Sequence, residues 1–286
     1  MVGIDCFTPY YSPKVKLRNL SDLRQSRRFR LVKKDILRCD LGQLVRKADV
    51  VFHLAAQPGV RLSWSKLDQY LRNNLLATQL VLESCGKHGK GLIFASSSSV
   101  YGDSEAYPTK EDALLNPVSP YGVTKQAGER LCTLFRRERS LKVTMLRYFT
   151  VYGPRQRPDM GIHRFIGFAL KDSPLPIYGD GMQERDFTFV SDIVSGTKSA
   201  AEKGIWGETM NLGGGRATRL LDLVNLILKS TGSHSKVEYE ARQAGDATKT
   251  SADISKAREL LGYSPSVDLE TGIRKQVDWQ KAERSA

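Results

Sequence analysis

Short apolar runs alternate with longer amphipathic stretches through the first half of the chain, and the alternation resumes after residue 200. The longer stretches predict helices, most clearly at Leu67–Cys85 and Tyr121–Arg139. Each apolar run is brief and bounded by polar or turn residues, as buried strands are. These predicted strands are Val2–Ile4, Arg30–Lys33, Val50–Leu54, Gly91–Ser96, Lys142–Arg147 and Met210–Leu212. Strands that alternate with helices predict an α/β fold, a doubly wound parallel sheet covered by helices on both faces.

The pattern changes after residue 152, where glycine and proline become frequent, beginning with Gly153-Pro154. This change predicts a main domain over 1–152 and a smaller C-terminal lobe over 153–286, with a return of the chain to the sheet around 186–214. Further helices are expected to complete the lobe near Leu220–Ser230 and Ile254–Leu261.

Composition narrows the class of protein. The formal net charge of +13 favours a phosphate-bearing ligand or partner, although scattered basic residues are more often a solvated surface. Because the four cysteines form no CxxC pair, we expect neither a zinc site nor a disulfide framework, and we expect the chain in the reducing cytoplasm. No run approaches the roughly 20 apolar residues of a membrane span, and no apolar signal segment follows the first residues.

The strongest chemical signal is the stretch SPYGVTKQAGERL. Tyr121 and Lys125 are four residues apart on a predicted helix, so their side chains lie on one face. An ammonium group beside a phenol favours the phenolate and lowers its pKa from about 10, which would make Tyr121 a base near neutral pH. Such a spacing is common by chance, so its weight depends on its context.

That context is a serine-rich strand end, IFASSSSVYG, which places Ser97 twenty-four residues before Tyr121. Polar groups at the carboxyl end of a parallel strand lie where doubly wound sheets bind ligands. The Ser97 hydroxyl there could bind the substrate oxygen that Tyr121 deprotonates. The alternative is a loop whose serines only satisfy backbone groups.

The chain resembles the extended short-chain dehydrogenase/reductases, and among them the NAD-dependent nucleotide-sugar epimerases. The resemblance rests on the strand-end serine and the YxxxK helix, together with four further segments in the expected order. These are HLAAQPGVRLSW (53–64), LRYFTVYGPRQRPDM (146–160), GDGMQERDFTFVSDI (179–193) and AGDATKTSADISKARELLGYSP (244–265). The closest similarity is to UDP-glucose and UDP-glucuronate 4-epimerases.

This resemblance implies a Rossmann-like fold and a mechanism. Tyr121 takes the proton of the sugar 4-hydroxyl, the C4 hydride passes to NAD, and it returns to the other face of a transient 4-keto sugar. Lys125 is implied to hold the nicotinamide ribose, and Ser97 to share the hydrogen bond. Family dehydratases carry Asp-Glu at the positions of Ser98 and Ser99, and decarboxylases carry Glu at the second. The two serines therefore favour epimerisation without elimination.

The resemblance also implies which residues contact the cofactor. Asp5 matches the residue that binds the adenosine ribose, and Asp35 and Ile36 match the adenine contact. The remaining implied contacts along NAD are Leu54, Ala55, Ala56, Asn74 and Tyr148.

Other positions match contacts to the UDP-sugar. Arg185 is implied to hold the diphosphate, since a guanidinium group suits paired oxygens. Asp246 is implied to lie near the uridine ribose. The arginine expected three residues before it is Gln243 here, so neighbouring Arg242 is the substitute candidate. Glucuronate epimerases often carry threonine at the position of Thr150, and Arg157 could then pair with a sugar carboxylate, so the resemblance favours UDP-glucuronate, with UDP-glucose as the second candidate. The alternative is that Thr150 is a neutral variant and Arg157 a surface residue.

The N-terminal region departs from the family pattern. Only four residues precede Asp5, and no GxxGxxG occurs in the chain, so we expect the first βα unit of the dinucleotide-binding fold to be missing. Either the start is misassigned, or the chain is truncated and then poorly stable or inactive. A nucleic-acid-binding or scaffold protein is the alternative function, although it would not require Ser97, Tyr121 and Lys125. The resemblance further implies a homodimer paired through the helices at 67–85 and 121–139.

Overall fold

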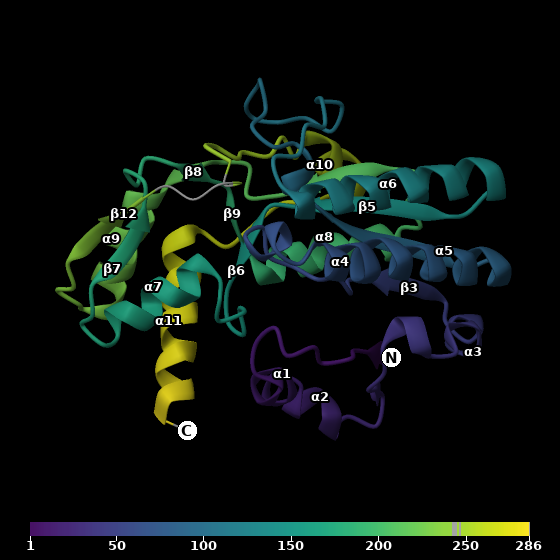
Figure 1. Cartoon of the computed structure of the whole chain (residues 1–286), viewed down its shortest axis with the longest axis horizontal. Coiled ribbons are helices and arrows are strands. Elements are labelled where there is room, and N and C mark those ends of the chain that lie inside the picture. Colours follow the sequence, from purple (N-terminus) through teal and green to yellow (C-terminus); the bar gives the residue numbers. More distant parts are fainter. Residues whose placement is uncertain (242–244, 246, 286) are drawn as a thin grey trace.

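A four-stranded parallel sheet forms the centre of the protein (Figure 1). The computed structural model describes residues 1–241, 245 and 247–285. The strands lie in the order β10-β5-β4-β3, and every pairing between them is parallel. Their bounds are β3 (Val50–His53), β4 (Gly91–Ser97), β5 (Val143–Tyr148) and β10 (Thr209–Leu212). The register of the central pair places Ser97 opposite Tyr148 at the carboxyl edge of the sheet.

Helices cover both faces of this sheet. On one face β4 contacts α5 (Ala77–His88) and α6 (Pro120–Arg139), and on the other the strands contact α8 (Val190–Glu202) and α10 (Ser255–Leu261). Phe94 packs in the core on the α5–α6 side, whereas Ile93 packs in the core that includes residues of α8 and α10. Because both faces are buried, β4 is apolar from Gly91 to Ala95. The predicted α/β fold is confirmed.

The long helix predicted over Leu67–Cys85 is interrupted. The structure has a short helix α4 (Leu67–Tyr70), a π-helix η3 (Leu71–Leu76) and then α5. Apolar periodicity does not reveal a π-helix, since one inserted residue leaves both flanking segments amphipathic. The strand predictions agree with the structure to within a residue at each end.

The N-terminal segment forms a separate small sheet. In it β1 (Val2–Ile4) pairs in parallel with β2 (Arg30–Val32), and neither strand is hydrogen-bonded to the described strands of the central sheet. In the described residues the predicted doubly wound sheet is therefore present as two separate sheets, β1-β2 and β10-β5-β4-β3. The segment lies at the bottom of Figure 1. Its remaining elements are α1 (Pro13–Asn19), α2 (Ser21–Gln25), η1 (Ile36–Arg38) and α3 (Leu41–Arg46).

Side chains of the N-terminal segment bind residues of the C-terminal half. Tyr10 donates a hydrogen bond to Asp159 (3.0 Å). The Asp22 carboxylate pairs with Arg155 at 2.7 Å, and Arg18 pairs with Glu283. The segment is thus attached to the C-terminal lobe as well as to the sheet domain, where Asp35 pairs with Arg72 of η3 at 3.5 Å.

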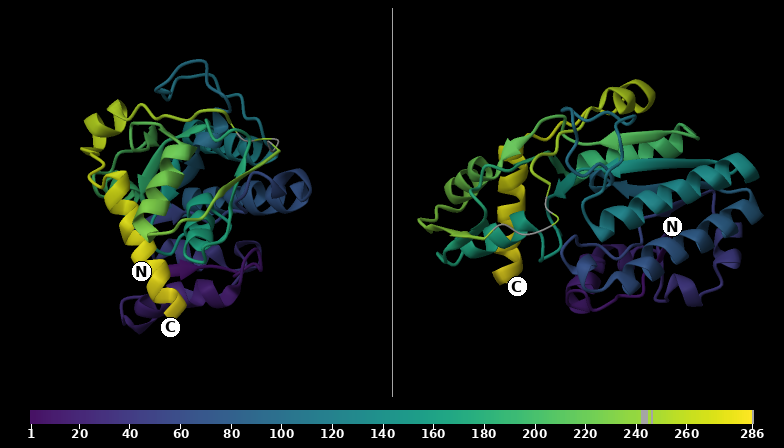
Figure 2. Two further views of the ribbon diagram at one scale, coloured as in Figure 1. Left: turned by 90° about the vertical axis from the view of Figure 1, so that its left-hand side faces the viewer. Right: turned by 45° about the horizontal axis from the view of Figure 1, so that its top comes forward.

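A second lobe lies beside the sheet domain (Figure 2). Its own apolar core includes Ile166, Val224 and Ile273. Its helices are α7 (Gly161–Ala169), α9 (Leu220–Thr231) and α11 (Leu269–Ser285), and its small sheet pairs β7 (Leu175–Tyr178) with β12 (Val237–Glu240). Two further strand pairs lead into it. They are β6 (Thr150–Tyr152) with β9 (Phe187–Phe189), and β8 (Glu184–Arg185) with β11 (Thr218–Arg219).

Asp186 fastens the segments that run between the sheet and the second lobe. Its fully buried carboxylate accepts hydrogen bonds from the backbone N–H groups of Gly214 (2.5 Å), Gly215 (3.0 Å) and Ala252 (3.0 Å). Burial raises the pKa of Asp186, and these donors act in the opposite direction. The Asp186 carboxylate therefore joins residues 214–215 and residue 252 to the segment that carries Arg185.

Two predictions about the class of protein can be compared with the structure. Within the described residues, no helix combines the length and the apolar content that crossing a membrane would require. All four cysteines are free thiols, and no cluster of metal-ligating side chains occurs in the described part of the chain.

Candidate active site

Ser97 lies at the point where β4 gives way to a 3-10 helix, η4 (Ser98–Val100). Its side chain caps this helix, because the Ser97 oxygen accepts the backbone N–H of Ser99 (3.1 Å) and its hydroxyl lies 3.1 Å from the Ser99 hydroxyl. The cap fixes the rotamer of Ser97. Ser98 and Ser99 follow on the same short helix, so no carboxylate occupies either position.

Tyr121 is the second residue of α6, so the start of that helix sets its place. Ser119 caps the helix by accepting the Gly122 N–H (3.1 Å), and Pro120 occupies the first helical position, where its missing N–H costs nothing. At Gly122 a Cβ atom would lie only 2.5 Å from the Ser99 carbonyl oxygen. The glycine therefore allows α6 to approach the serine-bearing helix η4 closely, and this brings Tyr121 to Ser97.

Three features of its environment affect the pKa of the Tyr121 phenol. Burial raises its pKa, while the hydrogen bond with the Ser97 side chain and the charge of Arg157 act to lower it. The expected effect of Lys125 on this pKa is absent, so the expectation of a lowered value is wrong for this structure. Tyr70 packs edge-on against the Tyr121 ring, with centroids 6.2 Å apart.

The orientation of Lys125 explains why this residue does not lower the pKa of Tyr121. Lys125 is 5% exposed, and its ammonium donates a hydrogen bond to the Ala95 carbonyl oxygen of β4 at 2.7 Å. Nζ also lies 5.2 Å from the centroid of the Phe94 ring. Burial lowers the pKa of Lys125 to about 8. The ammonium is therefore directed to the sheet, and it retains donors beyond the one that Ala95 uses.

Asn74 joins the π-helix to the loop after β3 and to α6. Its side-chain oxygen accepts the Gln57 N–H (2.6 Å), and its amide donates to the Gln57 carbonyl (3.1 Å) and to the Thr124 hydroxyl (3.0 Å). Every one of these partners lies in the protein, and Asn74 is 2% exposed. Asn74 consequently shapes the wall beside the predicted cofactor residues.

Arg157 is brought to the site by the loop after β6. Its guanidinium donates to Asp159 (3.2 Å) and lies 5.6 Å from the centroid of the Tyr10 ring. Because Tyr10 also binds Asp159, the three side chains form one cluster, and the charge of Arg157 reaches Tyr121. Thr150, in β6 on the same chain segment, pairs with Phe187 and donates its N–H to the Asp186 carbonyl.

The predicted cofactor residues lie at the ends of successive strands. Asp5 follows β1 with an exposed carboxylate that accepts the Phe7 N–H (2.6 Å), and Asp35 caps η1, which begins at Ile36. Leu54, Ala55 and Ala56 follow β3, and Leu54 is 59% exposed despite its apolar side chain. Tyr148 ends β5, and its hydroxyl lies 2.9 Å from that of Thr197 in α8.

The substrate residues of the second lobe are only partly described. Arg185 in β8 donates hydrogen bonds to the carbonyls of Glu184 (2.9 Å) and Thr248 (3.2 Å). Arg242 and Asp246 lie outside the described residues. The structure thus sets Tyr121 beside Ser97 through the approach of α6 to η4, and the charge of Arg157 acts to lower the pKa of Tyr121.

Sequence reasoning missed the contributions of Tyr70 and Asp159. Tyr70 donates hydrogen bonds to the carbonyls of Pro58 (2.8 Å) and Gly59 (2.5 Å), which holds the loop after β3 beside Tyr121. Asp159 follows Arg157 by two residues, and this spacing was the available signal for an ion pair. No local signal linked Tyr10 to a residue 149 positions away.

Comparisons with known proteins agree with this geometry. Residues 11–213 match the NAD dependent epimerase/dehydratase family. An uncharacterised UDP-glucose epimerase of Bacillus subtilis (strain 168) is 43% identical over 97% of this chain and 88% of its own length. A UDP-glucuronate 4-epimerase of Thermodesulfobacterium geofontis is 36% identical over 98% of this chain and 88% of its own.

A solved structure shows the same fold. The crystal structure of UDP-glucuronic acid 4-epimerase from Bacillus cereus, in complex with UDP-glucuronic acid and NAD, superposes with a TM-score of 0.95. It is 44% identical, and the match covers 99% of this chain and 91% of that one. These relatives give no support to the alternative of a nucleic-acid-binding or scaffold protein.

Proposed function

We propose that this chain, which belongs to the NAD dependent epimerase/dehydratase family, inverts the configuration at C4 of a UDP-sugar. UDP-glucuronate is the preferred candidate and UDP-glucose the second. The observation that carries the proposal is the close approach of the start of α6 to η4, at Gly122 and Ser99, which sets Tyr121 beside Ser97. The relatives described above support it, because one is a UDP-glucuronate 4-epimerase and the solved structure is a UDP-glucuronic acid 4-epimerase in complex with UDP-glucuronic acid and NAD.

The described residues suit two parts of NAD, the adenosine ribose and a ring system. The exposed carboxylate of Asp5 suits the hydroxyls of the adenosine ribose, and Asp35 and Ile36 lie on the neighbouring strand end. The exposed Leu54–Ala56 segment offers an apolar surface that a bound ring system would cover. NAD, when bound, supplies the acceptor and donor of the C4 hydride. Lys125 would hold the nicotinamide ribose with its remaining donors, and Asn74 and Tyr148 would border that site.

Tyr121 performs the proton transfer in this proposal. Its raised pKa keeps the phenol protonated at neutral pH in the free protein. A hydrogen bond from Ser97 and the positive charge of Arg157 both stabilise the phenolate, which is the form of Tyr121 that can accept the proton of the sugar 4-hydroxyl. Because Ser98 and Ser99 supply no carboxylate, the chain has no acid at these positions to expel water or carbon dioxide from the sugar.

Arg157 supports UDP-glucuronate as substrate. Its guanidinium binds the Asp159 carboxylate in this structure, at 27% side-chain exposure, so the same group suits the carboxylate of a sugar acid. Thr150 begins the strand that leads to this loop. Arg185 would hold the diphosphate, and Arg242 and Asp246 would contact the uridine ribose.

The test is turnover by the purified chain with added NAD. UDP-glucuronate and UDP-glucose are incubated separately, and the C4 epimers are followed by proton NMR. Tyr121→Phe should lower kcat by roughly a thousandfold or more, because general-base catalysis alone contributes 10²–10⁴-fold. Arg157→Met should impair UDP-glucuronate more than UDP-glucose. Absence of turnover with both sugars would contradict the proposal.

Three further features belong to this proposal. Exposed apolar residues on α4, η3 and α6 (Leu67, Leu71, Val123 and Leu134) support a homodimer through these helices. Light scattering of wild type and Leu71→Glu tests it, since only the variant should be monomeric. We also propose a cytoplasmic location, which the free cysteines support, and a division into a domain of residues 1–152 and a lobe of residues 153–286, with a return at 186–214.

A further inference from the structure

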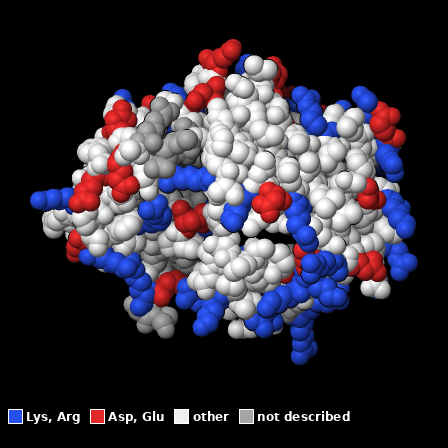
Figure 3. Space-filling view, viewed as in Figure 1, with Lys and Arg blue, Asp and Glu red and all other residues white. Residues whose placement is uncertain are grey.

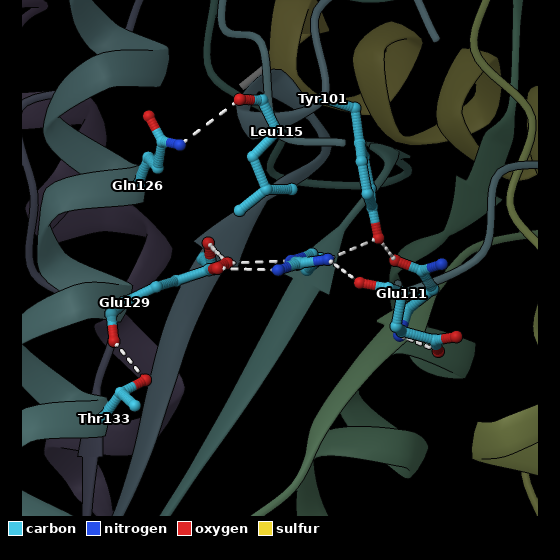
Figure 4. A network of polar contacts seen from close by, with 9 residues as sticks. Tyr101, Glu111, Leu115, Gln126, Glu129 and Thr133 are labelled. Atoms are coloured by element: carbon cyan, nitrogen blue, oxygen red, sulfur yellow. Dashed lines mark hydrogen bonds and ion pairs between the residues drawn. The ribbon is translucent and has the colours of Figure 1, made fainter. Parts of the chain in front are cut away.

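A buried ion pair lies beside the predicted catalytic groups, and the proposed reaction does not use it (Figure 4). Arg147 of β5 and Glu129 of α6 meet through two hydrogen bonds, from Nε to Oε1 at 2.9 Å and from Nη2 to Oε2 at 2.8 Å. Their side chains are only 5% and 6% exposed. Figure 4 shows these two hydrogen bonds as parallel dashed lines that leave the Glu129 carboxylate. Such a two-pronged arrangement fixes angle as well as distance.

The pair continues into hydrogen bonds on both sides. Ser96 donates to Oε1 of Glu129 at 2.5 Å, so the carboxylate is also tied to β4. On the other side, Nη1 of Arg147 donates to the Tyr101 hydroxyl and to the Glu111 carbonyl, both at 2.8 Å. Tyr101 in turn donates to Asn211 of β10 at 2.7 Å. Three strands and one helix therefore share one polar network.

Ser96, Glu129 and Arg147 each lie close in the sequence to a residue of the candidate site. Ser96 precedes Ser97 in β4, and the sheet register sets it directly opposite Arg147. Glu129 follows Lys125 by one helical turn and Tyr121 by two, so these three side chains lie on one face of α6. The network thus joins β4 to α6 one residue away from Ser97.

Stability alone does not account for such a pair. Removing two charges from water is costly, and replacing a buried pair by apolar residues of similar size is often neutral or stabilising. Apolar packing, however, has no preferred direction, whereas a bidentate pair with a third hydrogen bond defines one arrangement of helix and strand.

We propose that Ser96, Glu129 and Arg147 form a positioning unit that sets the separation and orientation of Ser97 on β4 and Tyr121 on α6. This inference rests on the proposed function, because it assigns the unit to that reaction. None of the three groups needs to touch the substrate. Their effect reaches the reaction through the contact of Ser97 with Tyr121.

The experiment compares two variants with wild type. Glu129→Leu/Arg147→Met removes both charges and leaves neither partner unpaired, and Ser96→Ala removes only the hydrogen bond to β4. We expect both to fold with melting temperatures within about 5 °C of wild type. The paired variant should lower kcat by roughly tenfold or more and change KM by less than about threefold, as expected when geometry rather than binding is lost. For Ser96→Ala we expect about a threefold loss of kcat.

A second measurement does not need turnover. The Tyr121 phenol is titrated by NMR of ¹³Cζ-labelled tyrosine, with Tyr121→Phe to assign its signal. The groups that face this phenol are Ser97 from β4, Arg157 from the loop after β6 and Tyr70 from α4. Loss of the Ser97 contact in either variant should move the titration of Tyr121 to higher pH, while Arg157 and Tyr70 are unchanged.

The outcomes separate the two proposals. Glu202→Gln, in the exposed pair of Lys198 and Glu202, is the control and should alter neither kcat nor the titration. An inactive wild type would overturn the proposed function, yet the Tyr121 titration would still decide the positioning unit. Unchanged kcat and unchanged titration in Ser96→Ala and in the paired variant would overturn the positioning unit. If the paired variant does not fold, the same two readouts on Ser96→Ala decide.

Discussion

Gly122→Ala is the substitution whose effect on catalysis follows most directly from the structure. A Cβ atom at this position would lie 2.5 Å from the Ser99 carbonyl oxygen and 2.8 Å from Cβ of Pro117. Cβ contacts under 3.0 Å are essentially never seen, so the start of α6 has to move by at least about 0.5 Å. The nearest atom belongs to the backbone, and no side-chain rotation can relieve the contact.

The magnitude follows from the reaction geometry. A misplacement of 1 Å between reacting groups costs about 100-fold in rate. A shift of about half that size between Tyr121 and Ser97 should therefore lower kcat by roughly tenfold, or about 1.4 kcal/mol of activation free energy. The free energy of unfolding should fall by about 0–2 kcal/mol, since alanine gains about 1 kcal/mol of helix propensity and the overpacking costs about 1–3 kcal/mol.

The assay pairs this variant with Gly86→Ala in α5. No heavy atom lies within 4 Å of a Cβ atom built at Gly86, so that variant should keep wild-type kcat and gain up to about 1 kcal/mol of stability. Steady-state kinetics and urea unfolding are measured for both. A Gly122→Ala variant with kcat within twofold of wild type would refute the reasoning about the approach of α6 to Ser99.

Three other predictions concern stability. Burial lowers the pKa of Lys125 to about 8. Between about pH 8 and pH 10 the unfolded chain therefore binds more protons than the folded chain. The free energy of unfolding should rise across this window by up to about 3 kcal/mol. Urea unfolding at pH 8 and pH 10 should show a larger rise in the free energy of unfolding for wild type than for Lys125→Met. An equal rise in the two proteins would contradict the prediction. Burial similarly lowers the pKa of His53 to about 3, so acidification from pH 7 to pH 5 should cost about 2 kcal/mol through this group, a loss absent from His53→Gln in thermal melts. Asp186→Asn should cost about 2 kcal/mol because buried N–H groups lose an acceptor, whereas exposed Asp112→Asn should cost almost nothing in the same unfolding assay.

The sheet domain was largely predictable because its strands are apolar on both faces and its helices amphipathic. β4, for example, packs Ile93 toward one core and Phe94 toward the other, and this leaves an uninterrupted apolar run in the sequence. A gap between the β1-β2 sheet and the central strands follows from the expectation that the first βα unit is missing, because the strand of that unit would lie between them. A three-residue strand such as Val2–Ile4 carries no signal for its partner.

The site was predictable as far as its residues share an element. Tyr121 and Lys125 lie on one helical face, and Ser97 ends a strand, so their proximity follows from periodicity and topology. The direction of the Lys125 ammonium did not follow, because the Ala95 carbonyl that accepts its hydrogen bond lies on β4, thirty residues earlier in the chain. Likewise, Glu129 was visible in GERL one turn after Lys125, but its partner Arg147 is eighteen residues farther along the chain.

The π-helix at Leu71–Leu76 has a consequence for how this chain tolerates insertions and deletions. Its wide turn accommodates one residue more than a regular helix would, and this sets the rotation of Asn74 toward Gln57 and Thr124. Deleting one residue there would restore a regular helix and better backbone hydrogen bonding. The same deletion would turn Asn74 by about 100° relative to α5 and part it from α6. The chain can therefore be shortened at this point into a more regular fold only by giving up the wall of its active site.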